Sequence, residues 1–166
     1  MRVLSLDTSM SKSGWAVIDV TDRKPSVIDY GLIKTNAKLT DGERLRELHS
    51  GIIAVLTQYP DIDEVIPIED GIVRFNTATK QIAKARGVIE FSLVDYRLEP
   101  VNIATVKKWA REVTGVSGKD GMKKENVEAA VKQYYGMAEI KNNKGGDCSD
   151  SIAVGTVYLL REGAVD

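Results

Sequence analysis

Four acidic residues stand at positions where their carboxylates can meet. Asp7 and Glu69 each close a short apolar segment, whereas Asp147 and Asp150 lie three residues apart at the start of a largely apolar one. A spacing of three places the last two on one face of a helix. Two carboxylates about 4 Å apart repel by about 4 kcal/mol at an effective dielectric of about 20, so a group of four must bind protons or a cation.

The donors determine which cation such a group prefers. Carboxylate oxygens with no cysteine or histidine pair nearby favour Mg²⁺ or Mn²⁺ over Zn²⁺. Two such ions can activate a water and stabilise the leaving oxygen when a phosphodiester is hydrolysed, and this chemistry needs no nucleophilic side chain. The acids therefore predict a two-metal hydrolytic centre if the fold brings them together.

Taken singly, each acid also has a plain structural interpretation. Asp147 can cap a helix, and Asp150 can sit in the first turn of that helix for its favourable interaction with the dipole. Asp7 can form a turn. Because side chains alternate along a strand, only one of Glu69 and Asp70 can face Asp7, and the strand pattern favours Glu69.

The elements that must position these acids can be read from hydrophobic spacing and from breaks. Strands are expected at residues 2–6, 15–18, 27–33, 64–69 and 100–103, and helices at 41–59, 77–96, 105–113, 122–135 and 147–161. Thr40 and Glu43 form a capping box for the first helix, and Pro67 indicates an irregular or edge position for the fourth strand. The order predicts a single α/β domain over 1–166, with an antiparallel three-stranded meander, further parallel strands and flanking helices.

Composition narrows the class of protein. The chain has 166 residues, 43% of them apolar, which is enough for one domain with its own core. Cys148 is the only cysteine, so no intramolecular disulfide or thiolate cluster is available. The N-terminus meets Asp7 before any apolar run long enough for a signal peptide, and no run of about 18 apolar residues follows. We therefore expect a cytoplasmic protein with no membrane partner.

The net charge of −1 conceals a segregation of charge. Residues 71–144 carry 14 Lys and Arg against 8 Asp and Glu, while the flanking residues carry 9 against 16. Such blocks occur on ordinary solvated faces, but they also suit a metal site beside a polyanion. Five basic residues are candidates for phosphate contacts as well as for solubility: Arg74, Lys80, Lys84, Lys119 and Lys123.

Most of the chain resembles the RuvC family of Holliday-junction resolvases, within the RNase H-like nuclease superfamily. The matching stretches are Leu4 to Ile18 with its strand-end Asp7, Ile68-Glu69, Lys84 to Val88, Val106-Lys107, Lys124 to Val127, and Gly146 to Val154 with its paired acids. The four acids occur in the order and spacing of that family.

This resemblance implies an RNase H-like fold and an activity. Asp7, Glu69, Asp147 and Asp150 would hold two Mg²⁺ ions, with Mn²⁺ able to substitute, and Lys107 and Lys124 would contact the scissile strand. The enzyme would be an endodeoxyribonuclease that nicks Holliday junctions, and other branched DNA such as forks, in pairs and leaves 5′ phosphates. It would act as a homodimer, because two symmetric strands must be cut.

Two departures from the family pattern indicate a divergent member, of the kind that a bacteriophage encodes and that works in the cytoplasm of a bacterial host. Thr8 and Ser9 replace the usual Pro-Gly after the aspartate. The aromatic wedge expected three residues after the glutamate is Ile72 here, with Phe75 further on. An aliphatic wedge can separate base steps but does not stack on a base.

Three other functions remain open on the sequence. An RNase H-like nuclease that acts on RNA or on RNA–DNA hybrids would use the same metal cage, and contacts to 2′-hydroxyls would distinguish it. The sugar kinase and actin superfamily also places an acid and a polar turn after its first strand, but it normally needs two such domains. A catalytically silent DNA-binding dimer is the third alternative, although crowded acids beside a phosphate give a binding module no advantage.

Overall fold

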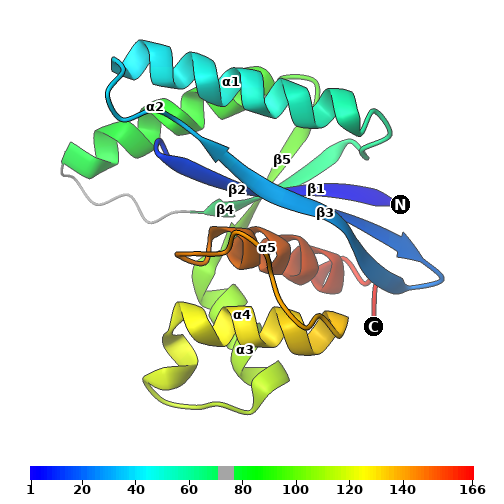
Figure 1. The fold of residues 1–166 in the computed structure, drawn as a ribbon. Coiled ribbons are helices and arrows are strands. Elements are labelled where there is room, and N and C mark those ends of the chain that lie inside the picture. The colour runs from blue at the N-terminus through cyan, green and yellow to red at the C-terminus, as the bar shows by residue number, and fades with distance from the viewer. Residues whose placement is uncertain (71–76) are drawn as a thin grey trace.

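The fold is built on a five-stranded sheet with the order β3-β2-β1-β4-β5, and the computed structural model describes residues 1–70 and 77–166 (Figure 1). The strands are β1 (Arg2–Asp7), β2 (Lys12–Thr21), β3 (Lys24–Lys34), β4 (Val65–Asp70) and β5 (Arg97–Asn102). The helices are α1 (Asp41–Gln58), α2 (Thr77–Ser92), α3 (Ile103–Thr114), the 3-10 turn η1 (Asp120–Met122), α4 (Lys124–Tyr135) and α5 (Asp147–Arg161). This order confirms the predicted mixed α/β class.

The sheet combines two kinds of pairing around β1. On one side β1, β2 and β3 form the predicted antiparallel meander, with pairs such as Leu4 with Val17. On the other side β4 joins β1 in parallel and β5 joins β4 in parallel. Because β1 and β4 run in the same direction, their carboxyl ends lie at the same edge of the sheet.

Each face of the sheet is covered by its own helices (Figure 1). Leu4 and Leu6 point to one face, where they pack with buried residues of α1 and α2 such as Leu48 and Ile89. Val3 points to the other face and joins the core formed with α5. Alternation along a strand requires this division, since neighbouring side chains point to opposite faces.

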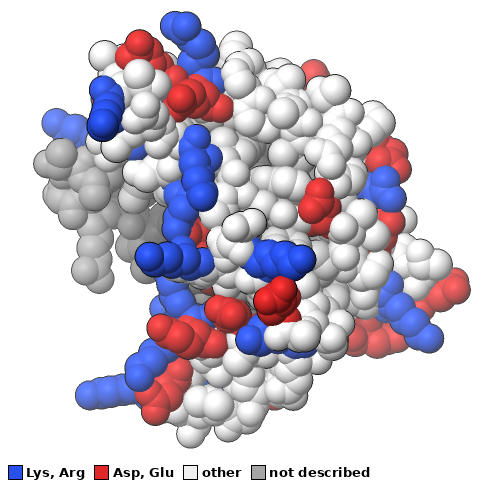
Figure 2. Space-filling model, viewed as in Figure 1, with Lys and Arg blue, Asp and Glu red and all other residues white. Residues whose placement is uncertain are grey.

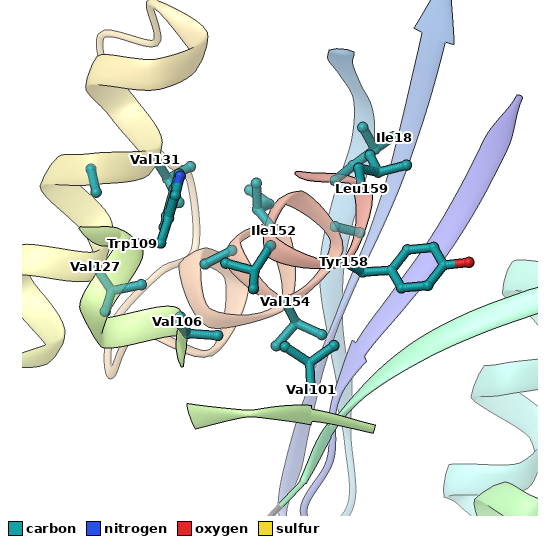
Figure 3. Packing of buried hydrophobic residues seen from close by; sticks show 14 of the residues in the cluster. Ile18, Val101, Val106, Trp109, Val127, Val131, Ile152, Val154, Tyr158 and Leu159 are labelled. Carbon is teal, nitrogen blue, oxygen red and sulfur yellow. The ribbon is translucent and has the colours of Figure 1, made fainter. Parts of the chain in front are cut away.

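α5 is the central helix of the second face, and nearly all of its residues are buried. It lies between the sheet and the outer helices α3 and α4, so that Trp109 and Val131 pack on its outer side (Figure 3). A Cβ at Gly155 would lie 2.7 Å from Oγ of Ser5, and the Ser5 hydroxyl donates a hydrogen bond of 2.7 Å to the carbonyl of Ser151. A small residue therefore lets α5 lie directly on β1.

Local signals predicted the start of α1 correctly but not the position of β4 in the sheet. The Thr40 and Glu43 capping box is present at the start of α1, as predicted. Pro67 indicated an irregular or an edge position, and the edge alternative is wrong, because β4 lies between β1 and β5 and Pro67 is buried. The ladder between β1 and β4 contains the pair Leu6 with Ile68 and is short. The missing N–H of Pro67 therefore disturbs it little.

Among the described helices, none is both long and apolar enough to cross a membrane.

Candidate active site

The four acids singled out in the sequence line one cleft of about 260 Å³. Asp7 and Glu69 come from the ends of β1 and β4. Asp147 and Asp150 come from the first turn of α5. The other lining residues are Ser9, Ile103, Lys107, Lys124 and Val127. The fold thus brings together residues that are up to 143 positions apart in the chain.

The parallel pairing of β1 and β4 explains why Asp7 and Glu69 meet. Leu6 pairs with Ile68, so the next residue along each strand is one of the two acids. Both acids therefore point to the face opposite the buried Leu6 and Ile68. Asp70 alternates to the other side, is exposed, and is not among the residues that line the cleft. The structure places Glu69, and not Asp70, beside Asp7.

A glycine contact brings the start of α5 to these strand ends. A Cβ at Gly14, in β2, would lie only 2.0 Å from the backbone oxygen of Asp147. Gly146 is the N-cap of α5, with a φ of 89°. Asp147 is therefore not the cap that one interpretation of the sequence allowed, and its carboxylate is free to line the cleft.

Burial and the charges of neighbouring acids raise the pKa values of Asp7, Glu69 and Asp150. The pKa of Asp7 is raised well above its usual range, first by burial and then by the negative charges of Glu69 and Asp150. Burial likewise raises the pKa of Glu69, with Asp150 as the next cause. The pKa of Asp150 is raised by burial even though Lys124 opposes the shift. Several carboxylates in one water-poor cleft hold protons tightly unless a cation compensates them.

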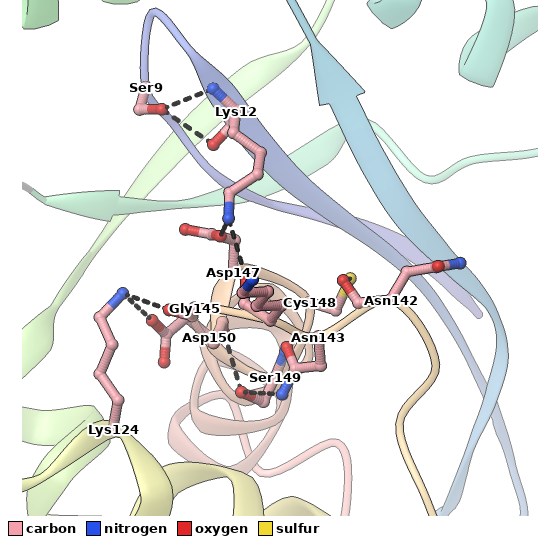
Figure 4. Close-up of polar contacts among 12 residues, drawn as sticks. Ser9, Lys12, Lys124, Asn142, Asn143, Gly145, Asp147, Cys148, Ser149 and Asp150 are labelled. Atoms are coloured by element: carbon pink, nitrogen blue, oxygen red, sulfur yellow. Dashed lines mark hydrogen bonds and ion pairs between the residues drawn. The ribbon is translucent and has the colours of Figure 1, made fainter.

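One compensating cation is Lys124, at the start of α4. Its ammonium lies 3.0 Å from Oδ2 of Asp150 and donates a hydrogen bond of 3.1 Å to the carbonyl of Gly145 (Figure 4). The Asp150 side chain is only 4% exposed. A carboxylate buried to this degree needs such a partner, because an unpaired buried charge is strongly unfavourable.

The second cation is Lys12, which the sequence analysis did not assign to the site. Its ammonium lies 2.6 Å from Oδ2 of Asp147 and donates a hydrogen bond of 2.9 Å to the carbonyl of Lys144 (Figure 4). The available signal was a single cation in the polar turn that follows Asp7. That signal is weak, because lysines are common in exposed turns and nothing local shows that α5 lies opposite.

The donor set fits a hard divalent cation. All four acids are oxygen donors, and Oδ2 of Asp147 is a buried oxygen with no hydrogen-bond partner. The Lys12 ammonium is near this oxygen without meeting the geometry of a hydrogen bond. Within the described residues, no three acid, histidine or cysteine side chains are grouped so that they could hold an ion as they stand. Two of the four carboxylates are instead engaged by lysines.

Of the other residues that the sequence analysis proposed as DNA contacts, only one lines the cleft among those that the structure describes. Lys107 lines the cleft from α3. Lys84 is bonded to Asp41, and Lys123 is bonded to Asp120, each at 2.6 Å. Lys80 and Lys119 are exposed and are not among the cleft residues, whereas Ile72, Arg74 and Phe75 lie outside the described residues. Figure 2 shows Lys and Arg side chains gathered over the part of this face where α5 begins, with Asp and Glu side chains among them.

Comparison with known proteins gives a consistent result. The family model described as "Crossover junction endodeoxyribonuclease RuvC" matches residues 3–158. A protein of that name from Fusobacterium nucleatum is 30% identical over 161 residues, covering 96% of this chain and 80% of the relative. Another, from Erythrobacter litoralis, is 31% identical over 152 residues, covering 92% and 88% of the two chains.

Solved structures agree on the fold. Thermus thermophilus RuvC in complex with a Holliday junction substrate superposes with a TM-score of 0.78 at 18% identity, covering 99% of this chain and 98% of that one. The fowlpox virus resolvase, in complex with Holliday junction DNA, has a TM-score of 0.59 at 16% identity, covering 98% and 99%. These likenesses confirm the predicted RNase H-like architecture. Together with the family model, they establish that the chain belongs to the RuvC family of crossover junction endodeoxyribonucleases.

Proposed function

We propose that this chain is a metal-dependent, structure-selective DNA endonuclease that resolves Holliday junctions and other branched DNA by paired nicking, leaving 5′ phosphates. Members of this family are nucleases that use divalent metals. The observation that carries the proposal for this chain is the convergence of Asp7, Glu69, Asp147 and Asp150 in one cleft.

For the metals, we propose two Mg²⁺ ions, which Mn²⁺ can replace, held by the four carboxylates. Bound ions would supply a nucleophilic water at neutral pH and Lewis-acid stabilisation of the leaving 3′ oxygen. Asp7 and Glu69 offer donors from the sheet, and the two acids of α5 offer donors from the opposite wall. A cation would also remove the repulsion that raises the pKa of Asp7.

The proposed DNA contacts begin at the rim of the cleft. Lys107 and Lys124 would bind the backbone of the cleaved strand, since both line the cleft beside the acids. Arg74, Lys80, Lys84, Lys119 and Lys123 would add phosphate contacts further out, and Ile72 and Phe75 would form the wedge that opens the junction. We also propose that residues 1–166 act as one domain and that two copies form a symmetric dimer with two identical sites. The dimer would act in the cytoplasm of a bacterial host and would be encoded by a bacteriophage.

The alternatives are less well supported. An RNA or hybrid nuclease would share the metal cage, but the family match extends over residues 3–158 and names an endodeoxyribonuclease. A silent DNA-binding module would gain nothing from a buried Asp150 among other acids, because such charges repel phosphates. DNA cleavage therefore explains both the match and the chemistry of the cleft.

A cleavage assay with paired variants tests this proposal. Labelled four-way junction, fork, linear duplex and RNA–DNA hybrid are each incubated with Mg²⁺, Mn²⁺ or EDTA. Glu69→Gln removes a cleft carboxylate and should abolish cleavage while junction binding persists. Asp70→Asn is the matched control, because Asp70 is the exposed neighbour and does not line the cleft. Full cleavage by Glu69→Gln, or preferential cleavage of the hybrid by the unaltered chain, would contradict the proposal.

A further inference from the structure

The Lys12 side chain reaches from β2 to Asp147 at the start of α5, one of the residues that line the cleft. Its backbone is held by Ser9, whose hydroxyl accepts a hydrogen bond of 3.0 Å from the N–H of Lys12 and donates one of 2.8 Å to its carbonyl. From this anchored position the ammonium reaches Oδ2 of Asp147 and the carbonyl of Lys144. The Lys12 side chain as a whole remains 32% exposed.

The ammonium lies where a cation is needed. Asp147 Oδ2 has no hydrogen-bond partner, and the neighbouring acids raise one another's pKa values. Lys12 contributes its charge to this oxygen at 2.6 Å. An ion that bound Asp147 through the same oxygen would be repelled by the ammonium, which lies only 2.6 Å from that oxygen.

We propose that Lys12 is a positioning residue of the metal site, which holds the Asp147 carboxylate in the metal-free chain and is displaced from Oδ2 when a divalent ion binds. The inference rests on the proposed metal-dependent function and deepens it. It accounts for a feature of the cleft, namely that no three of the described acids stand ready to share one ion. Lys12 keeps its backbone anchor at Ser9 throughout, so only the flexible end of its side chain has to move.

Binding of the metal alone tests the inference without any cleavage assay. Mn²⁺ and Mg²⁺ affinities are measured by titration calorimetry for the unaltered chain, Lys12→Met, Lys12→Arg and Lys24→Met. Lys12→Met should bind the ion about tenfold more tightly, because no ammonium has to leave, and its melting temperature in EDTA should fall. Lys12→Arg keeps the charge and should restore weaker binding. Lys24→Met alters an exposed lysine at the far end of the same meander and should bind like the unaltered chain.

The sign of the change separates displacement from a purely structural role. Loss of a structural support would weaken metal binding, so weaker or unchanged affinity in Lys12→Met overturns the inference. If the unaltered chain binds the ion and Lys12→Met binds no more tightly, only this inference fails. If the unaltered chain binds no divalent ion, both this inference and the proposed metal site fail.

A second measurement uses the unaltered chain and is independent of how Lys12→Met folds. The chain is labelled with ¹⁵N at its lysine ammonium groups, and the Lys12 signal is assigned by its loss in Lys12→Arg. Addition of Mg²⁺ should shift or broaden the Lys12 signal and leave that of Lys24 in place. A Lys12 signal that does not respond to Mg²⁺ at concentrations that saturate the site would overturn the inference.

Discussion

Replacing Gly14 with alanine is the most direct test of how the fold assembles the cleft. Gly14 lies in β2, and an added Cβ would meet the backbone oxygen of Asp147 at 2.0 Å and its carbonyl carbon at 2.7 Å. These two nearest atoms belong to the backbone of α5, so no side-chain rotation can relieve the contact. Since Gly14 is not in the left-handed region, the substitution introduces steric conflict and no dihedral strain.

The expected magnitude follows from this distance. The meander and α5 must separate by about 1 Å before the contact reaches even the shortest tolerated approach. Overpacking of this kind costs about 1–3 kcal/mol, and a backbone neighbour favours the upper end. Alanine returns about 0.5–1 kcal/mol by restricting the unfolded chain. We therefore expect a loss of about 2 kcal/mol in the free energy of unfolding, or about 4–8 °C in melting temperature for a chain of this size.

Catalysis should suffer more than stability. A displacement of about 1 Å at a catalytic group can reduce the rate by about a hundredfold, and the contact falls on Asp147 itself. Urea unfolding and junction cleavage are measured on Gly14→Ala and on Gly42→Ala at a temperature where both are folded. Gly42 lies in α1 with open space around its Cβ position, so its variant should be at least as stable as the unaltered chain and as active. Normal stability and normal cleavage in Gly14→Ala would refute the assigned packing of α5.

Three further outcomes are expected. Lys124→Ala should weaken junction affinity and lower the slope of log affinity against log salt by about one, measured by fluorescence anisotropy, and an unchanged slope would remove Lys124 from the phosphate contacts. Thr40→Ala should reduce the free energy of unfolding by about 1 kcal/mol, because the cap hydrogen bond is lost. Hydrogen bonds from Arg2 lower the pKa of Asp19 from 3.8. The ion pair of Asp19 with Arg2 therefore stabilises the folded chain above pH 3.8, and this stabilisation is lost as the pH falls through the lowered pKa. Asp19→Asn should therefore cost at most about 1 kcal/mol at neutral pH, and a urea-unfolding difference that persists in strong acid would contradict this assignment.

Local patterns in the sequence predict much of the framework. Alternation and turn residues locate the strands, and the Thr40 and Glu43 box begins α1 where it was expected. The order of elements follows from these signals, as do the acids at the ends of strands. Each of these features depends on interactions within a few residues, so it can be read without knowledge of the rest of the chain.

Other features depend on segments that are far apart in the chain. Pro67 indicated an irregular or an edge position, yet β4 is internal, because it pairs with β1 on one side and with β5 on the other. Lys12 contacts Asp147 because Gly14 allows α5 to approach the meander, a contact between residues more than 130 positions apart. The sequence by itself determined the elements and the candidate acids. Only the tertiary structure decided which side chains share the cleft, since packing between distant surfaces, and not local propensity, sets those distances.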